Sequence, residues 1–458
     1  MNGAASPSER FVPPLDKKQT GNKHDNMFPI PQWRDLWAAV LFYAHFIGFI
    51  AVSVYAFIQV RNVPITEKPG GIEIDGNMLR YFLISFASAA ATAVGLTVLT
   101  LGFMKSAPET MLHTAFIMNC VLSVGIAVWA FVAGAILPGV ILSIMAVITI
   151  VFYFAFRNRI PFSAILLQTV LDCLKAYPSM LLVTSSSVVI SVIYMAYFAS
   201  TFGALGVLHD RTKDPYAQAM MIYSAFSLFW TSQVLTNTAQ TSIAGVYATY
   251  YFLHGTGQAI INPVASSLRR ATTYSFGSIC FGSLIVAIIQ TIRFLLQMAT
   301  NRDSIAGAVV DCILGLLQGL VEYFNYFAYT QIAIYGKPYI QAAKDTWNLV
   351  KSRGVDAIVN DDLIGTCLGI SSFTIGIASG LVVYIISTLI YAKPWDESLV
   401  IAVVFGLLSI IIPAVAFEVI GAGATTTFVC LAEDPEALQR SKPHLYNAIM
   451  EKYSMITF

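Results

Sequence analysis

Charged residues are scarce in this chain. Only 11% of its 458 residues are Asp, Glu, Lys or Arg, whereas 57% are hydrophobic. A soluble domain carries roughly 25% charged residues, so the composition excludes an ordinary soluble protein and predicts a polytopic membrane protein. The mean hydropathy of +0.70 agrees with that class. The formal net charge of +1 argues against nucleic acid as a partner, because phosphate backbones are bound by clustered positive charge.

Several chemical signatures are also missing. The sequence has no phosphate-binding glycine loop, no zinc-ligand spacing, no nucleophile elbow and no Asn-X-Ser/Thr glycosylation acceptor. Its six cysteines are scattered in or beside apolar runs and predict no disulfide framework. We therefore expect no cofactor, no bound metal and no enzymatic activity.

Long apolar runs are what the chain does have. A helix needs about 20 apolar residues to cross a bilayer, so the runs predict an all-α helix bundle with ten transmembrane helices. The spans are expected near residues 36–59, 79–103, 111–133, 136–156, 179–205, 216–252, 273–299, 305–335, 363–391 and 398–430. The domain boundaries that follow are a disordered tail at 1–35, a transmembrane domain at 36–430 and a C-terminal tail at 431–458.

Lysine and arginine are divided unevenly between the two sides of this predicted bundle. If the N-terminus is cytoplasmic, 18 of the 26 Lys and Arg residues fall on the cytoplasmic side, 7 on the outside and 1, Arg293, within a span. Cytoplasmic loops of membrane proteins are enriched in positive charge. The distribution therefore predicts that both termini are cytoplasmic.

The sixth run is too long for an ordinary span. Residues 216–252 number 37, or roughly 55 Å as one continuous helix, and a polar stretch at 236–242 lies near the middle. We interpret the run as one crossing that is tilted, bent or broken at this stretch, since broken helices are common at transport sites. The alternative is a span that continues as a cytoplasmic helix.

Two cytoplasmic segments have the pattern of interfacial helices. Residues 161–175 precede Pro178, and residues 338–350 carry an apolar face that includes Trp347 and end before Gly354. Both are predicted to lie on the inner leaflet. Asp434 stands before Pro435 and predicts the N-cap of a short helix in the C-terminal tail.

A row of polar residues lies within the apolar run at 305–335. Its members follow one another at steps of 7, 4, 3 and 4 and therefore share one helix face: Asp311, Gln318, Glu322, Asn325 and Tyr329. A carboxylate at such depth costs several kcal/mol unless it faces protein, water or a ligand. The row predicts the wall of a polar pathway through the bundle.

Several sequence stretches resemble one known family. They are NYFAYTQIAIYGK at 325–337, IAGVYATYYF at 243–252, FGSICFGSLIVAIIQTIR at 276–293 and TTFVCLAEDPEA at 426–437. Together they are similar to the choline transporter-like protein family, and to its fungal members most of all. The loop at 60–78 is short and has no cysteine, unlike the long outside domain of animal members, and Thr425, Thr426 and Thr427 stand where an acidic residue is expected in them.

The resemblance implies a ten-span fold with cytoplasmic termini, located in the plasma membrane. It also implies transport of choline or a related amine such as ethanolamine. The partners expected are this small-molecule substrate and the lipid bilayer, and the sequence carries no signal for an oligomeric state.

Aromatic residues within the spans are candidates for binding such a solute. Choline is a permanent cation with three methyl groups, so aromatic faces and a carboxylate are its natural partners. The candidates form two sets, one before and one after the suspected break: Trp230, Gln233 and Asn237, and then Tyr247, Tyr250 and Tyr251. They form either an aromatic cage beside a polar groove or helix packing with an inner aromatic belt.

Two deep carboxylates complete the candidate site. Glu322 either attracts the cation, or is a neutral acid or the ion-pair partner of Arg293. Glu418 lies in the last span and is equally compatible with a substrate site and with a structural ion pair. For Arg293 itself we favour a structural pair with an acid. For Asp311, near the outer end of its span, we favour a hydrated interfacial position.

The leading hypothesis from sequence is a carrier that moves choline or a similar amine by alternating access. An inside-negative potential favours cation entry by about 2.3 kcal/mol per 100 mV, so no coupled ion is required. The alternatives are a non-transporting membrane scaffold or sensor that acts through its tails, a transporter of another organic solute, and a protein that acts on lipid head groups.

Overall fold

The fold is that of a computed structural model, which describes residues 32–62, 76–212, 215–254, 262–299, 305–441, 443 and 446–447. All regular structure in these residues is helical, as predicted. Most of the two predicted tails, at 1–31 and 448–458, lies outside the described residues.

The helices follow the predicted apolar runs closely. They are α1 (Leu36–Asn62), α2 (Gly76–Ser106), α3 (Pro108–Val132), α4 (Ile136–Phe156), α5 (Ile160–Ala176), α6 (Met180–Thr212), α7 (Pro215–Leu253), α8 (Pro263–Thr272), α9 (Phe276–Ala299), α10 (Ile305–Tyr335), α11 (Tyr339–Ile385), α12 (Trp395–Ser409), α13 (Ile411–Glu433) and α14 (Pro435–Ser441). A 3₁₀ turn at Arg157–Arg159 joins α4 to α5, and a π-helical turn at Ile386–Ile390 extends α11.

Proline and glycine set several of the helix boundaries. Pro108 and Pro263 begin α3 and α8, where a missing N–H costs no helical hydrogen bond. Gly134 and Gly336 follow the ends of α3 and α10 with φ of +78° and +59°, a backbone conformation that only glycine adopts at no cost. Gly336 belongs to the AIYGK stretch, so this motif specifies where α10 ends.

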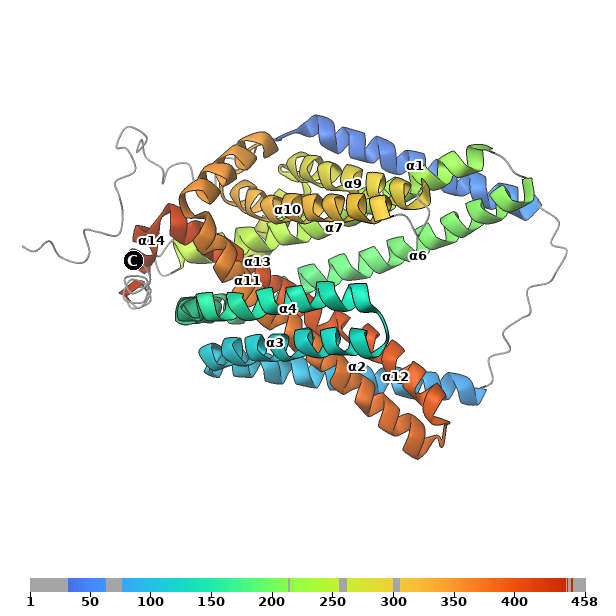
Figure 1. The fold of residues 1–458 in the computed structure, drawn as a ribbon. Coiled ribbons are helices and arrows are strands. Elements are labelled where there is room, and N and C mark those ends of the chain that lie inside the picture. The colour runs from blue at the N-terminus through green and yellow to red at the C-terminus, as the bar shows by residue number, and fades with distance from the viewer. Residues whose placement is uncertain are drawn as a thin grey trace, which may run out of the picture.

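The long helices form two groups that α13 joins (Figure 1). In the first group, α7 packs against α6, α9 and α10, and α1 packs against α6 and α9. In the second, α11 packs against α2, α3 and α12, and α4 packs against α3. Helix α13 contacts α7 and α10 of the first group and α2 and α11 of the second, so it lies at the centre of the bundle.

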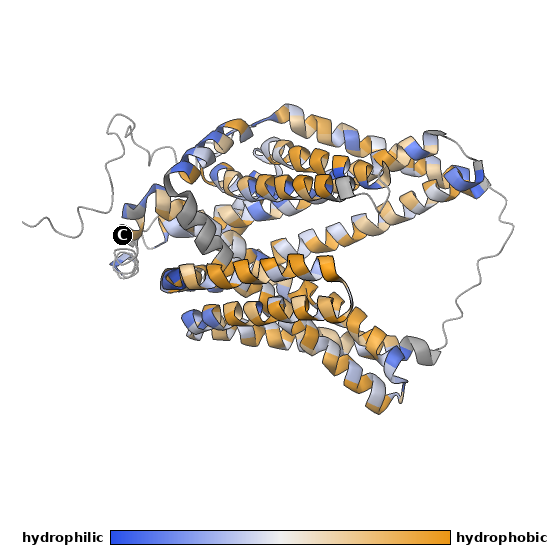
Figure 2. Cartoon of the chain, in the orientation of Figure 1, coloured by the Kyte–Doolittle hydropathy of each residue, from blue (hydrophilic) through white to orange (hydrophobic). Residues whose placement is uncertain are grey.

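Within the residues that the structure describes, eight helical segments are long and apolar enough to cross a membrane. The other two predicted spans, α7 and α10, are helices of 39 and 31 residues that carry more polar side chains and are not among the eight. Figure 2 shows hydrophobic residues along the lengths of the long helices and hydrophilic ones gathered near their ends. The protein is therefore a multi-pass helical membrane protein, and the number of ten spans stays a prediction.

Helix α7 is continuous from Pro215 to Leu253, so the break suggested at 236–242 is absent. A tilted or bent crossing and a span that continues as a cytoplasmic helix both stay predictions. The hydroxyls of Thr238, Thr241 and Ser242 each donate to the carbonyl four residues earlier in the same helix, at 2.7 Å. These bonds satisfy the polar side chains without opening the backbone. A polar stretch was therefore a misleading signal for a break.

The run at 398–430 is divided where a single span was predicted. Helix α12 ends at Ser409 and α13 begins at Ile411. Pro413 has no N–H for the Ser409 carbonyl, and the ladder resumes with Ala414 donating to Ile410 at 3.1 Å. A proline inside an apolar run thus interrupts the helix without ending the apolar segment.

One prediction about cytoplasmic helices needs correction. Residues 338–350 do not form a separate helix that ends before Gly354, because α11 runs without interruption from Tyr339 to Ile385.

The other predicted interfacial segment, 161–175, forms most of α5. This helix packs against α3, α11 and α13 and keeps Gln168, Asp172 and Lys175 exposed. Its place on the inner leaflet stays a prediction.

The C-terminal prediction is confirmed. The backbone N–H of Ala437 donates to Oδ1 of Asp434 at 3.1 Å, and Pro435 begins α14. Asp434 is therefore the N-cap of this helix.

Candidate functional site

Polar side chains from α7, α9 and α10 meet along one line within the first helix group. We call this line the polar seam; it consists of Gln233, Asn237, Gln290, Arg293, Asp311, Gln318, Glu322, Asn325 and Tyr329. All five members of the row predicted on α10 lie in it. Of the α7 candidates, the structure brings Gln233 and Asn237 to it.

Glu322 is held at the middle of the seam by three neutral amides. Its Oε1 accepts hydrogen bonds from Nε2 of Gln318 at 2.9 Å, of Gln233 at 3.2 Å and of Gln290 at 3.4 Å. These donors come from three different helices, so they fix the carboxylate between α7, α9 and α10. All three bonds end on Oε1, and within the described part of the chain no donor reaches Oε2.

Arg293 forms an ion pair with Asp311 and not with Glu322. Its Nε lies 3.0 Å from Oδ1 of Asp311 and its Nη2 lies 3.3 Å from Oδ2, while Nη1 donates to Oε1 of Gln318 at 2.7 Å. The favoured interpretation of a structural pair is confirmed, with Asp311 as the acid. Asp311 is thus a paired carboxylate whose side chain is 34% exposed, and Arg293 makes no bond to Glu322.

The seam becomes more buried toward Tyr329. Asn325 is 2% exposed and Tyr329 is fully buried, whereas Glu322 and Gln318 are only partly buried. Nδ2 of Asn237 donates to Oγ of Ser283 at 2.9 Å and to Oη of Tyr329 at 3.2 Å. The seam is therefore partly exposed at the Asp311 end and buried at the Tyr329 end.

Tyr339, a residue that the sequence reasoning missed, completes this closed end. It begins α11, and its hydroxyl donates to Oδ1 of Asn325, whose Nδ2 donates to the Gly282 carbonyl at 3.2 Å. Burial raises the pKa of Tyr339 to about 12, so its phenol stays protonated and can donate. We call Asn237, Ser283, Asn325, Tyr329 and Tyr339 the inner closure.

Gly282 makes the inner closure possible. A Cβ at this position would lie 2.5 Å from Oη of Tyr329 and 2.5 Å from Cε2 of Tyr339. Only a residue without a side chain lets both tyrosines pack against α9. The glycine lies in the stretch FGSICFGSLIVAIIQTIR, but only the tertiary contacts show which of its glycines is constrained.

Residues 32–35 contact Tyr339 of the inner closure and the segments next to it, and we call these residues the N-terminal strap. Oδ2 of Asp35 accepts from the Tyr339 backbone N–H and from Oγ of Ser278, both at 2.7 Å. Nε of Arg34 donates to the Gly336 carbonyl at 3.1 Å. The sequence reasoning placed these residues in a disordered tail, because a polar segment before the first span gives no signal of a tertiary contact.

Trp230 lies outside the seam. Its Nε1 donates to the Cys280 carbonyl at 3.1 Å, and its ring is 1% exposed. Its ring centroid lies 5.3 Å from that of Phe42 and 5.0 Å from that of His45. These contacts join α7 to α1 and α9, so the indole faces are covered by protein.

The three tyrosines of the predicted cage lie farther along α7 and point to different neighbours. Oη of Tyr247 donates to the Val170 carbonyl at 3.4 Å, and Oη of Tyr251 donates to the Asp434 carbonyl at 3.1 Å. The ring of Tyr250 packs on Tyr177, with centroids 6.2 Å apart. All three are buried, and they connect α7 to α5, α14 and the loop before α6.

Glu418 lies on α13 away from the seam. Its Oε1 accepts from the hydroxyl of Tyr326 at 3.4 Å. A second carboxylate that the sequence reasoning did not select, Glu433, accepts from Gln331 and Tyr335 at the end of α10. Both acids therefore join α13 to α10.

The seam has the chemistry of a site for a polar or positively charged solute. It offers a carboxylate whose Oε2 has no protein donor, and beside it Oε1 of Gln290, a buried acceptor that also has no hydrogen-bond partner in the described residues. Those residues contain no group of three or more His, Cys, Asp or Glu side chains that could hold a metal ion.

These features define the class: a multi-pass helical membrane protein with a hydrogen-bonded polar seam that is closed at one end. The family described as plasma-membrane choline transporter matches residues 140–436. The chain is 32% identical to Protein PNS1 of Mycosarcoma maydis, over 96% of this chain and 87% of that protein. It is 33% identical to a CTL-like protein of Dictyostelium discoideum, over 95% and 78% of the two chains, and 31% identical to Protein PNS1 of Candida albicans, over 96% and 91%.

The chain therefore belongs to the choline transporter-like family, which confirms the resemblance found in the sequence motifs. Membership supports a role as a membrane transporter and suggests that the protein is not an enzyme. The matched residues include the whole polar seam and leave out the N-terminal strap.

Proposed function

We propose that this protein transports choline or a related small amine cation across the plasma membrane, with both termini in the cytoplasm. The observation that carries the proposal is the partly buried carboxylate of Glu322. Its Oε1 is fixed by three amides, while its Oε2 has no donor among the described residues. A carboxylate held in this way attracts a cation and is not neutralised by Arg293, which pairs with Asp311.

The acceptor beside Glu322 suits the other end of the solute. Oε1 of Gln290 is buried without a donor, which costs free energy unless a ligand or water satisfies it. Choline carries a hydroxyl that can donate to this oxygen. The pair of acceptors therefore supports a solute with a positive charge and a hydrogen-bond donor.

Two phenylalanines offer the aromatic faces that a trimethylammonium group prefers. Phe229 lies one turn before Gln233 on α7, and Phe294 lies one turn after Gln290 on α9. Their ring centroids are 6.3 Å apart with planes inclined by 69°, and both rings are only partly buried. We propose these rings for the cation–π role, because the faces of Trp230 are covered by Phe42 and His45.

The graded burial of the seam supports transport by alternating access. The Asp311 end is partly exposed, and the inner closure seals the other end. Gln318 and Glu322 would meet the solute from outside. Asn237, Asn325 and Tyr329 would separate to release it into the cytoplasm. Tyr247, Tyr250, Tyr251 and Glu418 would move with the helices they join, without contacting the solute in this state.

The test is uptake of radiolabelled choline into proteoliposomes that hold the purified protein, with and without an imposed inside-negative potential. We expect saturable uptake that the potential accelerates, since about 2.3 kcal/mol per 100 mV favours cation entry. Glu322→Gln should lower kcat/KM by about 100-fold, because a charge-assisted contact to a desolvated cation is lost. Glu397→Gln is the matched control, since Glu397 is an exposed carboxylate at the start of α12.

Normal uptake by Glu322→Gln would overturn the site assignment while leaving transport intact. No uptake of choline or ethanolamine by folded wild-type protein would overturn the proposed solutes. That outcome would favour a different organic solute, action on lipid head groups, or a non-transporting scaffold that acts through its tails.

A further inference from the structure

Asn237 of the inner closure shares one amide nitrogen between three acceptors. Its Nδ2 lies 2.9 Å from Oγ of Ser283, 3.2 Å from Oη of Tyr329 and 3.5 Å from Oε1 of Gln233. An amide nitrogen carries only two hydrogens, so it can serve only two of these acceptors well at one time. The two shorter contacts are those within the inner closure, and the contact with Gln233 is therefore the weakest of the three.

Gln233 lies one turn before Asn237 on α7 and connects it to Glu322. Its Oε1 faces Asn237, while its Nε2 donates to Oε1 of Glu322 at 3.2 Å. Both ends of one planar amide group are thus engaged, so a rotation that shortens one contact changes the other. Within the described residues, no other chain of side-chain hydrogen bonds runs from Glu322 to the inner closure.

The other two amides that hold Glu322 do not lead to the inner closure. Gln290 donates from Nε2 to the same Oε1 at 3.4 Å, but its own Oε1 has no hydrogen-bond partner in the described part of the chain. Gln318 donates at 2.9 Å, and its Oε1 accepts from Arg293 toward the opposite end of the seam. Gln233 alone therefore joins the carboxylate to the buried end.

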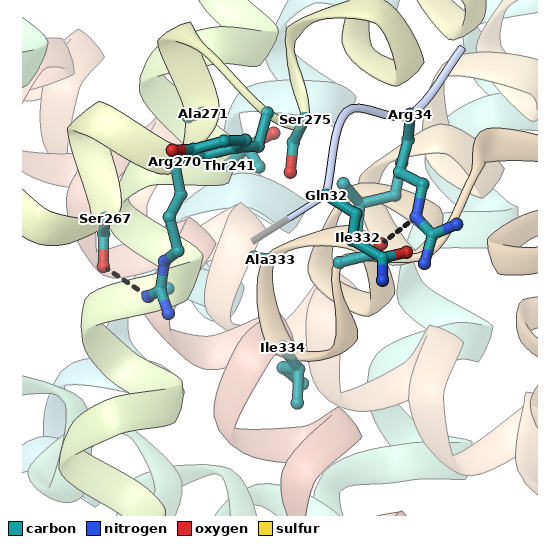
Figure 3. A pocket seen from close by; sticks show the side chains of 13 residues that line it. Gln32, Arg34, Thr241, Ser267, Arg270, Ala271, Ser275, Ile332, Ala333 and Ile334 are labelled. Atoms are coloured by element: carbon teal, nitrogen blue, oxygen red, sulfur yellow. Dashed lines mark hydrogen bonds between the residues drawn. The ribbon is translucent and has the colours of Figure 1, made fainter. Parts of the chain in front are cut away.

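The inner closure separates the seam from a cavity beside the N-terminal strap. Thr241 lies one turn after Asn237 on α7, and Ile332 lies one turn after Tyr329 on α10. Both line this cavity, and Figure 3 shows their side chains there. The bond between Asn237 and Tyr329 is therefore a contact of α7 with α10 that has to break before the seam can reach the cavity.

We propose that Gln233 is a positioning residue that couples the charge of Glu322 to the inner closure. This role rests on the proposed function of Glu322 as the cation site. A cation at Glu322 takes up part of the carboxylate charge, which weakens the bond from Nε2 of Gln233. The amide of Gln233 then turns its Oε1 toward Asn237 and draws one hydrogen away from the inner closure. Binding of the solute thereby favours opening of the buried end.

The test measures how fast N-ethylmaleimide modifies Cys280 in the purified full-length protein, with no solute present. Cys280 follows Ile279 on α9, whose carbonyl accepts from the hydroxyl of Tyr329 at 3.4 Å, so its labelling reports opening beside the inner closure. Glu322→Gln removes the charge as a bound cation would. It should speed the labelling about fivefold, which is the low end of usual couplings between sites.

Two methionine variants decide whether this effect runs through Gln233. In Gln233→Met, which has no amide to turn toward Asn237, Glu322→Gln should change the labelling rate by less than about twofold. Gln290→Met is the matched control, because it removes a bond to the same Oε1 of Glu322 and leaves Asn237 untouched. The fivefold effect of Glu322→Gln should persist in that background.

A fivefold effect that survives in Gln233→Met would overturn the proposal, because the coupling would then use another route. An unchanged rate at Cys280 in Glu322→Gln would overturn it too. Cys367, buried in the second helix group, reports global unfolding. If its labelling also rises in Glu322→Gln, Glu322→Asp replaces that variant in the same cycle, since the shorter side chain withdraws the carboxylate from Gln233.

The coupling and the proposed transport can fail separately. The labelling experiment contains no choline, so a wrong solute leaves its outcome unchanged. Potential-driven choline uptake together with an unchanged rate at Cys280 in Glu322→Gln would remove the role of Gln233 and leave the proposed function intact.

Discussion

Single residues decide where the polar seam is open and where it is closed. Glu322 is placed by amides alone, whereas the closed end depends on two tyrosines that approach α9 at Gly282. Arg293 is occupied by Asp311 and Gln318, which leaves the carboxylate of Glu322 as the charge that faces the seam. A small substitution at Glu322 or at Gly282 is therefore expected to alter the seam itself.

Gly282→Ala should destabilise the inner closure. The added methyl would overlap Tyr329 and Tyr339, and overpacking of this kind costs about 1–3 kcal/mol. The expected result is a lower midpoint of thermal unfolding in detergent, together with faster choline efflux from loaded proteoliposomes.

Gly319→Ala is the matched control, because no atom lies within 4 Å of a Cβ added there. It should leave the midpoint unchanged or raise it slightly, since alanine favours a helix by about 1 kcal/mol over glycine. An equal loss of stability in both variants would mean that the contacts of Gly282 with the two tyrosines are not limiting.

At the scale of elements, the inner closure depends on segments that are distant in sequence. The strap lies at residues 32–35, its contacts lie at Ser278 on α9 and at Tyr339 on α11, and Gly336 ends α10 between them. Gly277 lets the strap approach, since a Cβ there would lie 2.3 Å from the Asp35 carbonyl oxygen. The strap therefore connects α1 to the start of α11 across α9.

Asp35→Ala should loosen this connection. Two hydrogen bonds to a carboxylate are lost, each worth about 1.5–3 kcal/mol. Cys280 is fully buried on α9 beside the closure, and its modification by N-ethylmaleimide should become about tenfold faster as local opening increases. Mass spectrometry of the labelled peptide measures the rate.

A second buried cysteine, labelled in the same experiment, is the control. Cys367 is buried in the second helix group, and its labelling should not change in Asp35→Ala. Asp396→Ala, at an exposed position on α12, should change neither rate. An unchanged rate at Cys280 in Asp35→Ala would show that the strap does not limit access to the closure.

At the scale of the whole molecule, the two helix groups are joined by α13 and by the direct packing of α11 on α10. The polar seam lies wholly within the first group, and α4, of which only Gly139 and Ala146 are buried, lies in the second. Helix α7 contacts α6, α8, α9, α10 and α13. Asn237 of α7 donates to Ser283 of α9 and to Tyr329 of α10, so opening the inner closure requires α7 to move relative to α9 and α10.

The predicted orientation can be tested by glycosylation mapping. The sequence has no natural Asn-X-Ser/Thr acceptor. Any glycosylation of a variant therefore comes from the acceptor inserted in it. Acceptors placed at 213–214 and at 300–304 should be glycosylated, whereas one placed at 255–261 should not, because α7 is expected to cross the membrane once. Glycosylation at 255–261 would contradict this topology and the predicted number of spans.

The sequence alone predicted most of the helices and one wall of the candidate site. Apolar runs predicted most of the long helices, because burial in lipid requires apolar surface, but not that α11 begins as early as Tyr339. The steps between Asp311 and Tyr329 were enough to place five side chains on one helix face. The motifs identified the family correctly. Asp434 was also recognised as an N-cap, since capping depends on neighbouring residues only.

What only the tertiary structure decided is which side chains meet. Trp230 and Gln233 are three residues apart on α7, yet one is buried against α1 and α9 while the other binds Glu322. The choice of Asp311 as the partner of Arg293, the role of Tyr339 and the position of the strap all depend on contacts between distant helices. Local periodicity determines the face of a helix, but the partner of that face is set by packing, which involves the whole chain.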